Sequence, residues 1–90
     1  MTVESVRGVL IVDDRRTGRI ERSDGTFWAI LDEHFLDALL GQVPCYVGGE
    51  HAYWDEIELR GELDSTGTRL MRVLWARIMR DGDAFELGPH

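Results

Sequence analysis

The segment 56–63 alternates between charged side chains and apolar residues or glycine, and this alternation constrains the fold more than any other feature of the sequence. A repeat of two residues is typical of a β-strand that buries one face and exposes the other to water. Ile57, Leu59 and Leu63 would lie on the buried face. Residues 64–67, Asp-Ser-Thr-Gly, fit a hairpin loop, because the final glycine can adopt a positive φ. The sequence therefore predicts a strand that turns back into a β-hairpin.

The segment 68–80 that follows fits two different structures. As a strand, it needs one β-bulge near Leu70 and Met71, because these adjacent apolar residues interrupt the alternation. As a helix, it would gather its apolar residues on one half of the helical wheel and its arginines on the other. We predict a strand, because consecutive strands usually pair with each other, and the helix is the alternative.

The strand prediction has two consequences. A single bulge sets the register of the hairpin. The expected cross-strand pairs are Glu62 with Arg69, Leu59 with Val73, Ile57 with Trp75 and Asp55 with Arg77. The strand would also have a second apolar face, formed by Leu70, Leu74 and Ile78. This face needs cover from a helix or from a second copy of the chain, so a homodimer is a further hypothesis.

Three further strand-like segments precede a helix in the first half of the chain. They are residues 3–12, 19–22 and 26–31. Asp32 can cap a helix over residues 33–40, whose apolar residues form one stripe, and Gly41 can end that helix.

A fourth strand-like segment follows the helix at residues 42–47, and Pro44 within it indicates a sheet edge or a bulge. Residues 48–55 are expected to form a loop before the hairpin. A charged turn at residues 81–83 and a short segment at residues 84–87 follow the hairpin.

This order of three strands, one helix and further strands resembles the five-stranded OB barrel, in which a helix lies between the third and fourth strands. The resemblance implies a mainly β fold, with a single domain over residues 1–90. That domain would be a small five- to six-stranded OB-like barrel with one short helix at about residues 33–40. The alternative is an α+β fold in which residues 68–80 form a second helix.

The first hairpin also resembles that of cold-shock-type OB barrels in its spacing. The residues that carry the likeness are Gly8, Gly18-Arg19-Ile20 and Asp24-Gly25. Cold-shock domains expose aromatic side chains on these strands for base stacking, whereas this chain has Leu10, Val12 and Ile20 there. The likeness therefore supports a barrel and disfavours nucleic-acid binding.

The composition is that of a globular domain with an acidic surface. The chain has a net charge of −7, and all of its basic residues are arginine. This charge repels nucleic acids and anionic membranes at long range and favours a basic partner. The single Cys45 excludes an internal disulfide, and no apolar run approaches the roughly 20 residues that span a bilayer. We therefore expect a reduced, cytoplasmic protein that does not interact with a membrane.

The side chains that could carry catalysis are few and lack a supporting motif. Those that titrate near neutral pH are His34, His51, His90 and Cys45. Cys45 has no activating partner close in sequence, and no spacing of His, Cys or acidic residues matches a metal site. We therefore expect no enzyme activity, no cofactor and no metal. A small hydrolase or metal-dependent enzyme built on His51 and Cys45 is the weakest alternative.

Two loops offer candidate binding residues, because the corresponding loops flank the ligand face of an OB barrel. The first loop, residues 13–18, carries part of an arginine cluster that could contact an anion. The second, residues 48–55, carries large aromatic side chains of the kind that anchor interfaces. The candidate binding residues are Arg15, Arg16, Arg19, His51, Tyr53 and Trp54.

The leading functional hypothesis is a small, non-enzymatic binding module that acts through protein–protein contact. Tyr53, Trp54 and His51 would anchor the contact, beside an acidic strand face that suits a basic partner. Inhibitor and immunity proteins work in this way. The alternative is an OB-type binder of single-stranded nucleic acid that uses the arginine cluster.

Overall fold

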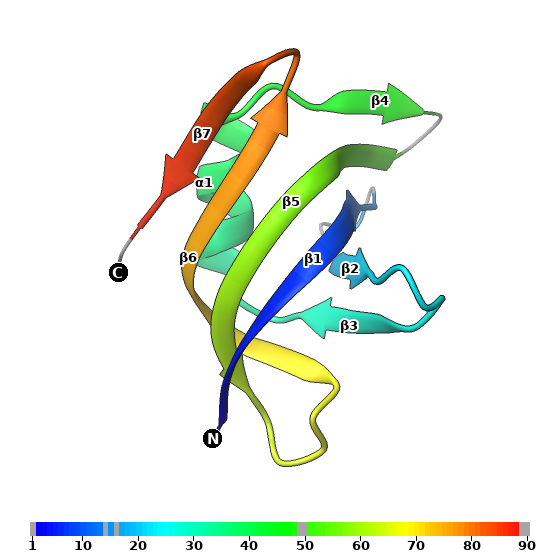
Figure 1. Ribbon diagram of the computed structural model, residues 1–90, viewed down its shortest axis with the longest axis vertical. Coiled ribbons are helices and arrows are strands. Elements are labelled where there is room, and N and C mark those ends of the chain that lie inside the picture. Colours follow the sequence, from blue (N-terminus) through cyan, green and yellow to red (C-terminus); the bar gives the residue numbers. More distant parts are fainter. Residues whose placement is uncertain (1, 14, 16, 49–50, 89–90) are drawn as a thin grey trace.

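The computed structural model describes residues 2–13, 15, 17–48 and 51–88 (Figure 1). This part of the chain contains seven strands in one sheet and a helix between the third and fourth strands. The strands are β1 (Thr2–Val12), β2 (Gly18–Glu21), β3 (Phe27–Ile30), β4 (Tyr46–Gly48), β5 (His51–Leu63), β6 (Arg69–Arg80) and β7 (Asp83–Leu87), and the helix is α1 (Glu33–Gln42).

Five of the strands curl into a ring. β1 pairs with β2, β2 with β3, β3 with β6, and β6 with β5, which pairs again with β1. These pairs are antiparallel except β3–β6, in which Ala29 lies beside Arg69 and Ile30 beside Leu70. β4 and β7 extend β5 and β6 beyond the ring, which makes seven strands instead of the predicted five or six. The predicted mainly β fold with one short helix is confirmed, and the ring is compatible with an OB-like small barrel.

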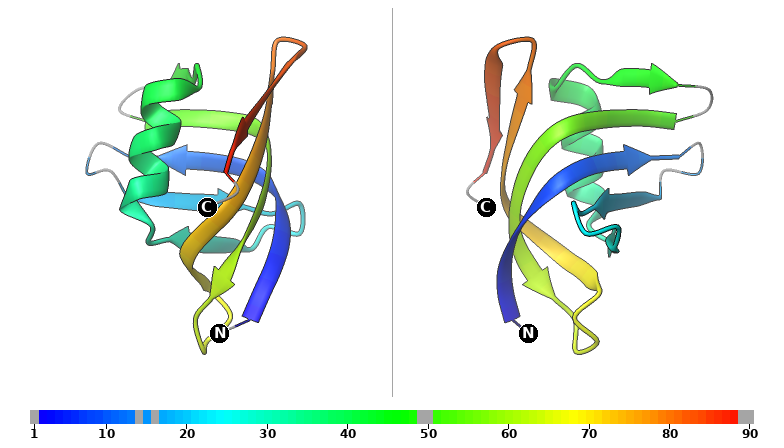
Figure 2. Two further views of the ribbon diagram at one scale, coloured as in Figure 1. Left: turned by 90° about the vertical axis from the view of Figure 1, so that its left-hand side faces the viewer. Right: turned by 45° about the vertical axis from the view of Figure 1, so that its right-hand side comes forward.

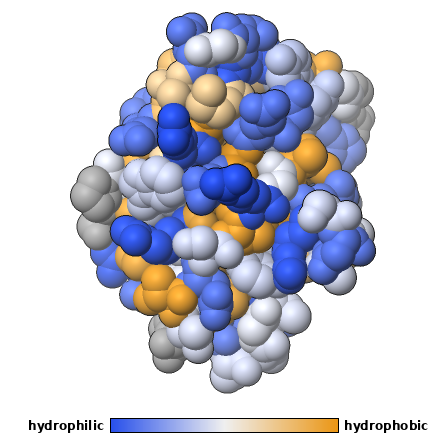
Figure 3. Space-filling view, viewed as in Figure 1, coloured by the Kyte–Doolittle hydropathy of each residue, from blue (hydrophilic) through white to orange (hydrophobic). Residues whose placement is uncertain are grey.

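The hydrophobic core fills the inside of the ring, and α1 lies across one end of it (Figure 2). α1 contributes Phe35, Leu36 and Leu39 to the same cluster as Ile20 and Leu70 of the ring strands. No polar or charged residue in the described segments is buried. On the face in Figure 3, hydrophobic side chains are interspersed with hydrophilic ones. No helix in this part of the chain has the length and apolar composition that a membrane span requires.

α1 begins at the predicted cap but ends later than predicted. The Asp32 Oδ1 atom accepts a hydrogen bond from the Phe35 backbone N–H at 3.1 Å. The helix continues to Gln42, because the Val43 backbone N–H still donates to the Leu39 carbonyl at 3.0 Å. The prediction that Gly41 ends the helix is therefore wrong, and this glycine lies in the last turn.

The strand between α1 and the long hairpin is shorter than predicted, because β4 covers only Tyr46–Gly48. β4 lies at the edge of the sheet, as Pro44 indicated, although Pro44 itself precedes the strand. The prediction of a loop over residues 48–55 is wrong, because β5 begins at His51 and pairs with β4. The aromatic residues assigned to that loop belong to a strand, so their side chains alternate between the two faces of the sheet.

Residues 68–80 contain the strand β6, so the alternative of a second helix is wrong. β6 has two register shifts against β5 instead of the predicted single bulge, and Met71 and Leu74 are left without a partner in the register. The buried residues of β6 are Leu70, Val73, Ala76 and Ile78. Each bulge inserts one residue, so Leu70, Val73 and Ala76 recur at intervals of three residues, and Ile78 follows Ala76 after the ordinary interval of two. The interval of three residues explains why the sequence also fits a helix.

The two bulges also change the cross-strand pairs. The observed pairs are Glu62 with Arg72, Leu59 with Ala76, Ile57 with Ile78 and Glu58 with Arg77. The predicted register is therefore wrong by three positions along β6. The second apolar face that suggested a homodimer does not form, because Leu70 and Ile78 lie in the core and Leu74 is half-buried.

Candidate binding site at the open end of the ring

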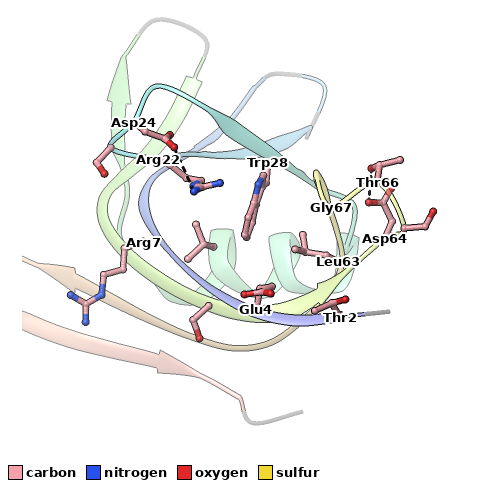
Figure 4. Close-up of a pocket in the computed structure, with 14 residues that line it drawn as sticks. Thr2, Glu4, Arg7, Arg22, Asp24, Trp28, Leu63, Asp64, Thr66 and Gly67 are labelled. Atoms are coloured by element: carbon pink, nitrogen blue, oxygen red, sulfur yellow. Dashed lines mark hydrogen bonds and ion pairs between the residues drawn. The ribbon is translucent and has the colours of Figure 1, made fainter.

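A cavity of about 820 Å³ opens at the end of the ring away from α1. Figure 4 looks into this cavity, with α1 behind the ring. Its walls are the first half of β1, the loop after β2, the middle of β3 and the hairpin loop after β5. We call it the ring cavity and define it by the wall residues Glu4, Val6, Arg22, Trp28, Leu63 and Asp64.

The ring cavity lies where β1 separates from β2. β1 pairs with β2 only from Val9 to Val12, whereas residues 2–8 pair with β5 alone. Gly8 stands at the point of separation, and a side chain there would collide with the backbone carbonyl of Glu21. The glycine thus lets β1 pass close to the end of β2, and the first half of β1 becomes a wall of the cavity.

An aromatic ring with a guanidinium group on its face lies inside the ring cavity. Trp28 pairs with Ile20 across β2 and β3, and it packs half-buried against the core. The guanidinium carbon of Arg22 lies 4.9 Å from the centre of the Trp28 ring, within the range of a cation–π interaction. The Arg22 Nη2 atom also lies 3.5 Å from the Asp24 Oδ2 atom. The face of Trp28 is therefore an environment that suits a guanidinium.

Two of the carboxylates around the ring cavity are held by threonine side chains. The Asp24 Oδ1 atom accepts hydrogen bonds from the Thr26 hydroxyl at 2.6 Å and from the Thr26 backbone N–H at 2.9 Å. The Asp64 Oδ1 atom accepts one from the Thr66 hydroxyl at 2.7 Å. These hydrogen bonds are the main reason why the pKa of each carboxyl group lies below its ordinary value of 3.8. Both groups therefore stay ionised at neutral pH.

Glu4 supplies a third carboxylate. Glu4 lies on the same face of β1 as the buried Val6. Its partner in the neighbouring strand β5 is Gly61, which has no side chain. Figure 4 shows Glu4 at the wall of the cavity below Trp28. The side chain of Glu4 is exposed, and its carboxylate makes no hydrogen bond or ion pair with another residue in the described segments. Its charge is therefore free to meet a ligand.

Removing either threonine hydroxyl should raise one of these pKa values. We expect Thr66→Val to raise the pKa of Asp64 toward 3.8 and Thr26→Val to raise that of Asp24. Because both pKa values are lowered in the folded protein, their contribution to stability is complete above about pH 3.8 and is lost as the pH falls through the folded values. Carboxyl carbon chemical shifts in an acid titration measure each pKa. Each variant is the control for the other, and an Asp64 that keeps its low pKa in Thr66→Val would contradict the assignment.

The arginines predicted as binding residues lie outside the ring cavity, although Arg22 of the same basic cluster is on its wall. Arg15 is exposed, and its backbone N–H donates to the Asp13 Oδ1 atom at 3.0 Å. The Arg19 Nε atom lies 3.4 Å from the Glu21 Oε1 atom, which offsets its charge. Arg16 lies outside the described residues. Neither Arg15 nor Arg19 lines the ring cavity.

The aromatic residues predicted as anchors also lie elsewhere. Trp54 is 1% exposed and belongs to the core, so it cannot contact a partner as predicted. Tyr53, on the other face of β5, stacks on Tyr46 of β4 with the ring centres 5.4 Å apart. His51 is exposed at the start of β5. The structure therefore does not bring these three residues together on one surface.

A second polar cluster attaches β4 to the turn between β6 and β7. The guanidinium carbon of Arg80 lies 3.4 Å from the centre of the Tyr46 ring. The Tyr46 hydroxyl lies 3.4 Å from the Asp81 Oδ1 atom and donates a hydrogen bond to it. The nearby Asp81 carboxylate is the main cause that raises the pKa of Tyr46 above its ordinary value of 10.0. These contacts stabilise the edge of the sheet.

Sequence reasoning places Arg22 in the basic cluster and the other wall residues of the ring cavity in predicted strands or turns. Asp24 and Asp64 each precede a glycine within three residues and fit turn positions. Asp64 could have been predicted from its position in the loop between two consecutive strands of the ring. Because β4 lies outside the ring, β5 and β6 are the fourth and fifth strands of the ring in chain order, and the loop between them is residues 64–68 instead of the predicted 48–55.

No three side chains of His, Cys, Asp or Glu in the described segments are grouped so that they could hold a metal ion. Cys45 is a free, half-buried thiol. Comparison of the chain with protein-family models, with curated protein sequences and with solved structures finds no match.

Proposed function

We propose that this protein is a non-enzymatic binding module that holds a basic segment of another protein in the ring cavity. We further propose that the ring is an OB-type barrel, with β1, β2, β3, β5 and β6 as its five strands. The observation that carries the functional proposal is the environment of Trp28. Its face lies beside the Arg22 guanidinium and within a rim of carboxylates from Glu4, Asp24 and Asp64.

The charge balance of the ring cavity supports a cationic ligand. The two arginines on its wall have acidic neighbours, with Arg7 Nε 3.3 Å from Glu58 Oε2 and Arg22 Nη2 3.5 Å from Asp24 Oδ2. Glu4 adds a negative charge without a counterion among the described residues. The whole chain carries a net charge of −7, so long-range attraction favours a basic partner and repels nucleic acid.

The chemistry of the contacts indicates a ligand with arginine or lysine side chains. An incoming guanidinium can form charge-assisted hydrogen bonds with carboxylates and can stack on the face of Trp28, where it would compete with Arg22. Exposed ion pairs are individually weak, so we expect an affinity on the order of micromolar for a short basic peptide. A folded partner would add contacts outside the cavity.

Isothermal titration calorimetry with short peptides tests this proposal. We expect a peptide of alternating arginine and valine to bind, and a matched peptide of alternating glutamate and valine to give no heat. The double variant Asp24→Asn with Asp64→Asn should weaken binding by about tenfold, because two contacts of modest strength are lost. Asp83→Asn is the control, because Asp83 is an exposed carboxylate in β7, outside the ring cavity.

Three results would contradict the proposal. The first is an arginine–valine peptide that gives no heat at low salt. The second is a double variant that binds this peptide as tightly as the unchanged protein does. The third is a single-stranded oligothymidylate that binds more tightly than the peptide, since this would indicate that the ligand is nucleic acid.

A further inference from the structure

From the pairing of β1 we infer that the basic segment binds as an extended β-strand, which adds to the free edge of β1 over residues 2–7 and lies in the ring cavity. This inference rests on the proposed function and specifies how the partner is recognised. It assigns the affinity to backbone hydrogen bonds with β1 and the selectivity to Glu4, Trp28 and the two loop carboxylates.

The first half of β1 has one unpaired edge. Residues 2–8 pair with β5 on one side, and the pairing with β2 on the other side starts only at Val9. In an antiparallel pair, alternate residues direct both N–H and C=O to the partner strand, and the residues between them direct these groups to the opposite edge. No other backbone segment among the described residues bonds to that edge. Such an edge is a template for another strand.

The ring cavity runs along this edge. Thr2, Glu4, Ser5, Val6 and Arg7 all line it, which places nearly the whole first half of β1 on one wall. Six residues of β-strand extend over roughly 20 Å, so the wall can pair with about five or six residues of a partner. In Figure 4 Asp24 lies across the opening from Glu4, and Asp64 lies at the right, near the start of β1, where Thr2 pairs with Leu63.

The side chains of the cavity select which strand can bind. Alternate side chains of an added strand would point to the inside of the ring, toward Trp28, Leu63 and Glu4. A charge on the inward face of an edge strand opposes pairing with an apolar strand, and Glu4 occupies this position. The same charge attracts a strand that places an arginine or lysine opposite it, so Glu4 both excludes apolar edges and favours basic ones.

The two outer edges of the sheet provide a comparison. β4 has three residues and β7 has five, and neither contributes to the wall of the ring cavity. Strand addition at β4 or β7 would therefore lack both the aromatic face and the acidic rim.

Amide hydrogen exchange, followed by nuclear magnetic resonance with the arginine–valine peptide as probe, tests the inference. Without peptide, we expect the amides of residues 2–7 to alternate between slow exchange, where they bond to β5, and fast exchange, where they face the cavity. With saturating peptide, the fast set should slow by at least tenfold, while the amides of β4 and β7 stay unchanged. If calorimetry shows binding but the fast set stays fast, strand addition is wrong and the binding function stands. If the peptide does not bind, both are wrong.

Backbone methylation of the peptide separates strand addition from attraction between charges. Two peptides with the same side chains, each N-methylated at alternate amides, should differ in affinity by at least tenfold, because only one of the two sets of N–H groups faces β1. Equal affinities would overturn the inference.

Substitutions on the protein test the selectivity that we assign to Glu4. Glu4→Arg should weaken binding of the peptide by at least tenfold, whereas Glu86→Arg should leave it unchanged, because Glu86 is an exposed charge on the edge strand β7. Equal effects of the two substitutions would show that net charge alone governs binding. Sedimentation equilibrium that shows a dimer with the cavity-facing β1 amides already protected would instead indicate that a second copy of the chain occupies the edge.

Discussion

Replacing Asp32 with alanine is expected to lower the free energy of unfolding by about 3 kcal/mol. The Oδ1 atom of Asp32 accepts from the Phe35 N–H at 3.1 Å and caps α1, and its Oδ2 atom accepts from the Val73 N–H in β6 at 2.9 Å. Loss of the cap costs about 1 kcal/mol. The unsatisfied, partly buried N–H of Val73 adds roughly 1–3 kcal/mol. Chemical denaturation measures the change.

Asp32→Asn is the matched control for this prediction. Asparagine has one acceptor oxygen, so it can keep one of the two hydrogen bonds. The Asp32→Asn variant should therefore lose some stability, but less than the Asp32→Ala variant. The same carboxylate lies next to the contact that closes the ring, where the Leu31 N–H donates to the Leu70 carbonyl at 2.8 Å. An alanine variant that loses less than about 1 kcal/mol would show that Asp32 only caps the helix.

Replacing Gly8 with alanine is expected to destabilise the protein by about 3 kcal/mol. The added methyl group would meet the carbonyl of Glu21, and the α-carbon of Arg22 lies close behind it. Backbone atoms cannot rotate out of the way, so β1 and β2 must separate at the point where the ring cavity begins. Thermal and chemical unfolding measure the loss of stability.

Gly41→Ala is the control, because it makes the same substitution at a glycine with open space around it in the last turn of α1. Alanine has the higher helix propensity, so this variant should be more stable by roughly 0.5–1 kcal/mol. Opposite signs at the two positions would support the close approach at Gly8. A Gly8→Ala variant as stable as the unchanged protein would contradict it.

Where one periodicity continues without interruption, the sequence predicts the structure well. The strand around Ile57, Leu59 and Leu63 and its turn at Gly67, with a φ of 74°, follow directly from alternation and turn chemistry. The cap at Asp32 is equally local. These features depend on residues that are close in sequence, so the sequence alone is enough to predict them.

The register of the long hairpin and the ring cavity could not be predicted in this way. Two register shifts leave Met71 and Leu74 unpaired where the sequence suggested one bulge, and the observed pairs lie three positions along β6 from the predicted ones. The cavity joins Glu4, Trp28 and Asp64, which are far apart in the sequence and meet only because the ring closes. Asp32 shows the same limit, since its cap was predictable and its bond to Val73 was not.

The most direct test of the central claim, that the ring cavity binds a basic segment, is chemical-shift mapping with the arginine–valine peptide. We predict that the largest shift changes cluster at the amides of Glu4, Val6 and Leu63 and at the Trp28 indole, all of which belong to the ring cavity. Changes confined to residues 15–19 or 51–53 would contradict the claim and would place the binding surface at the binding residues that the sequence suggested.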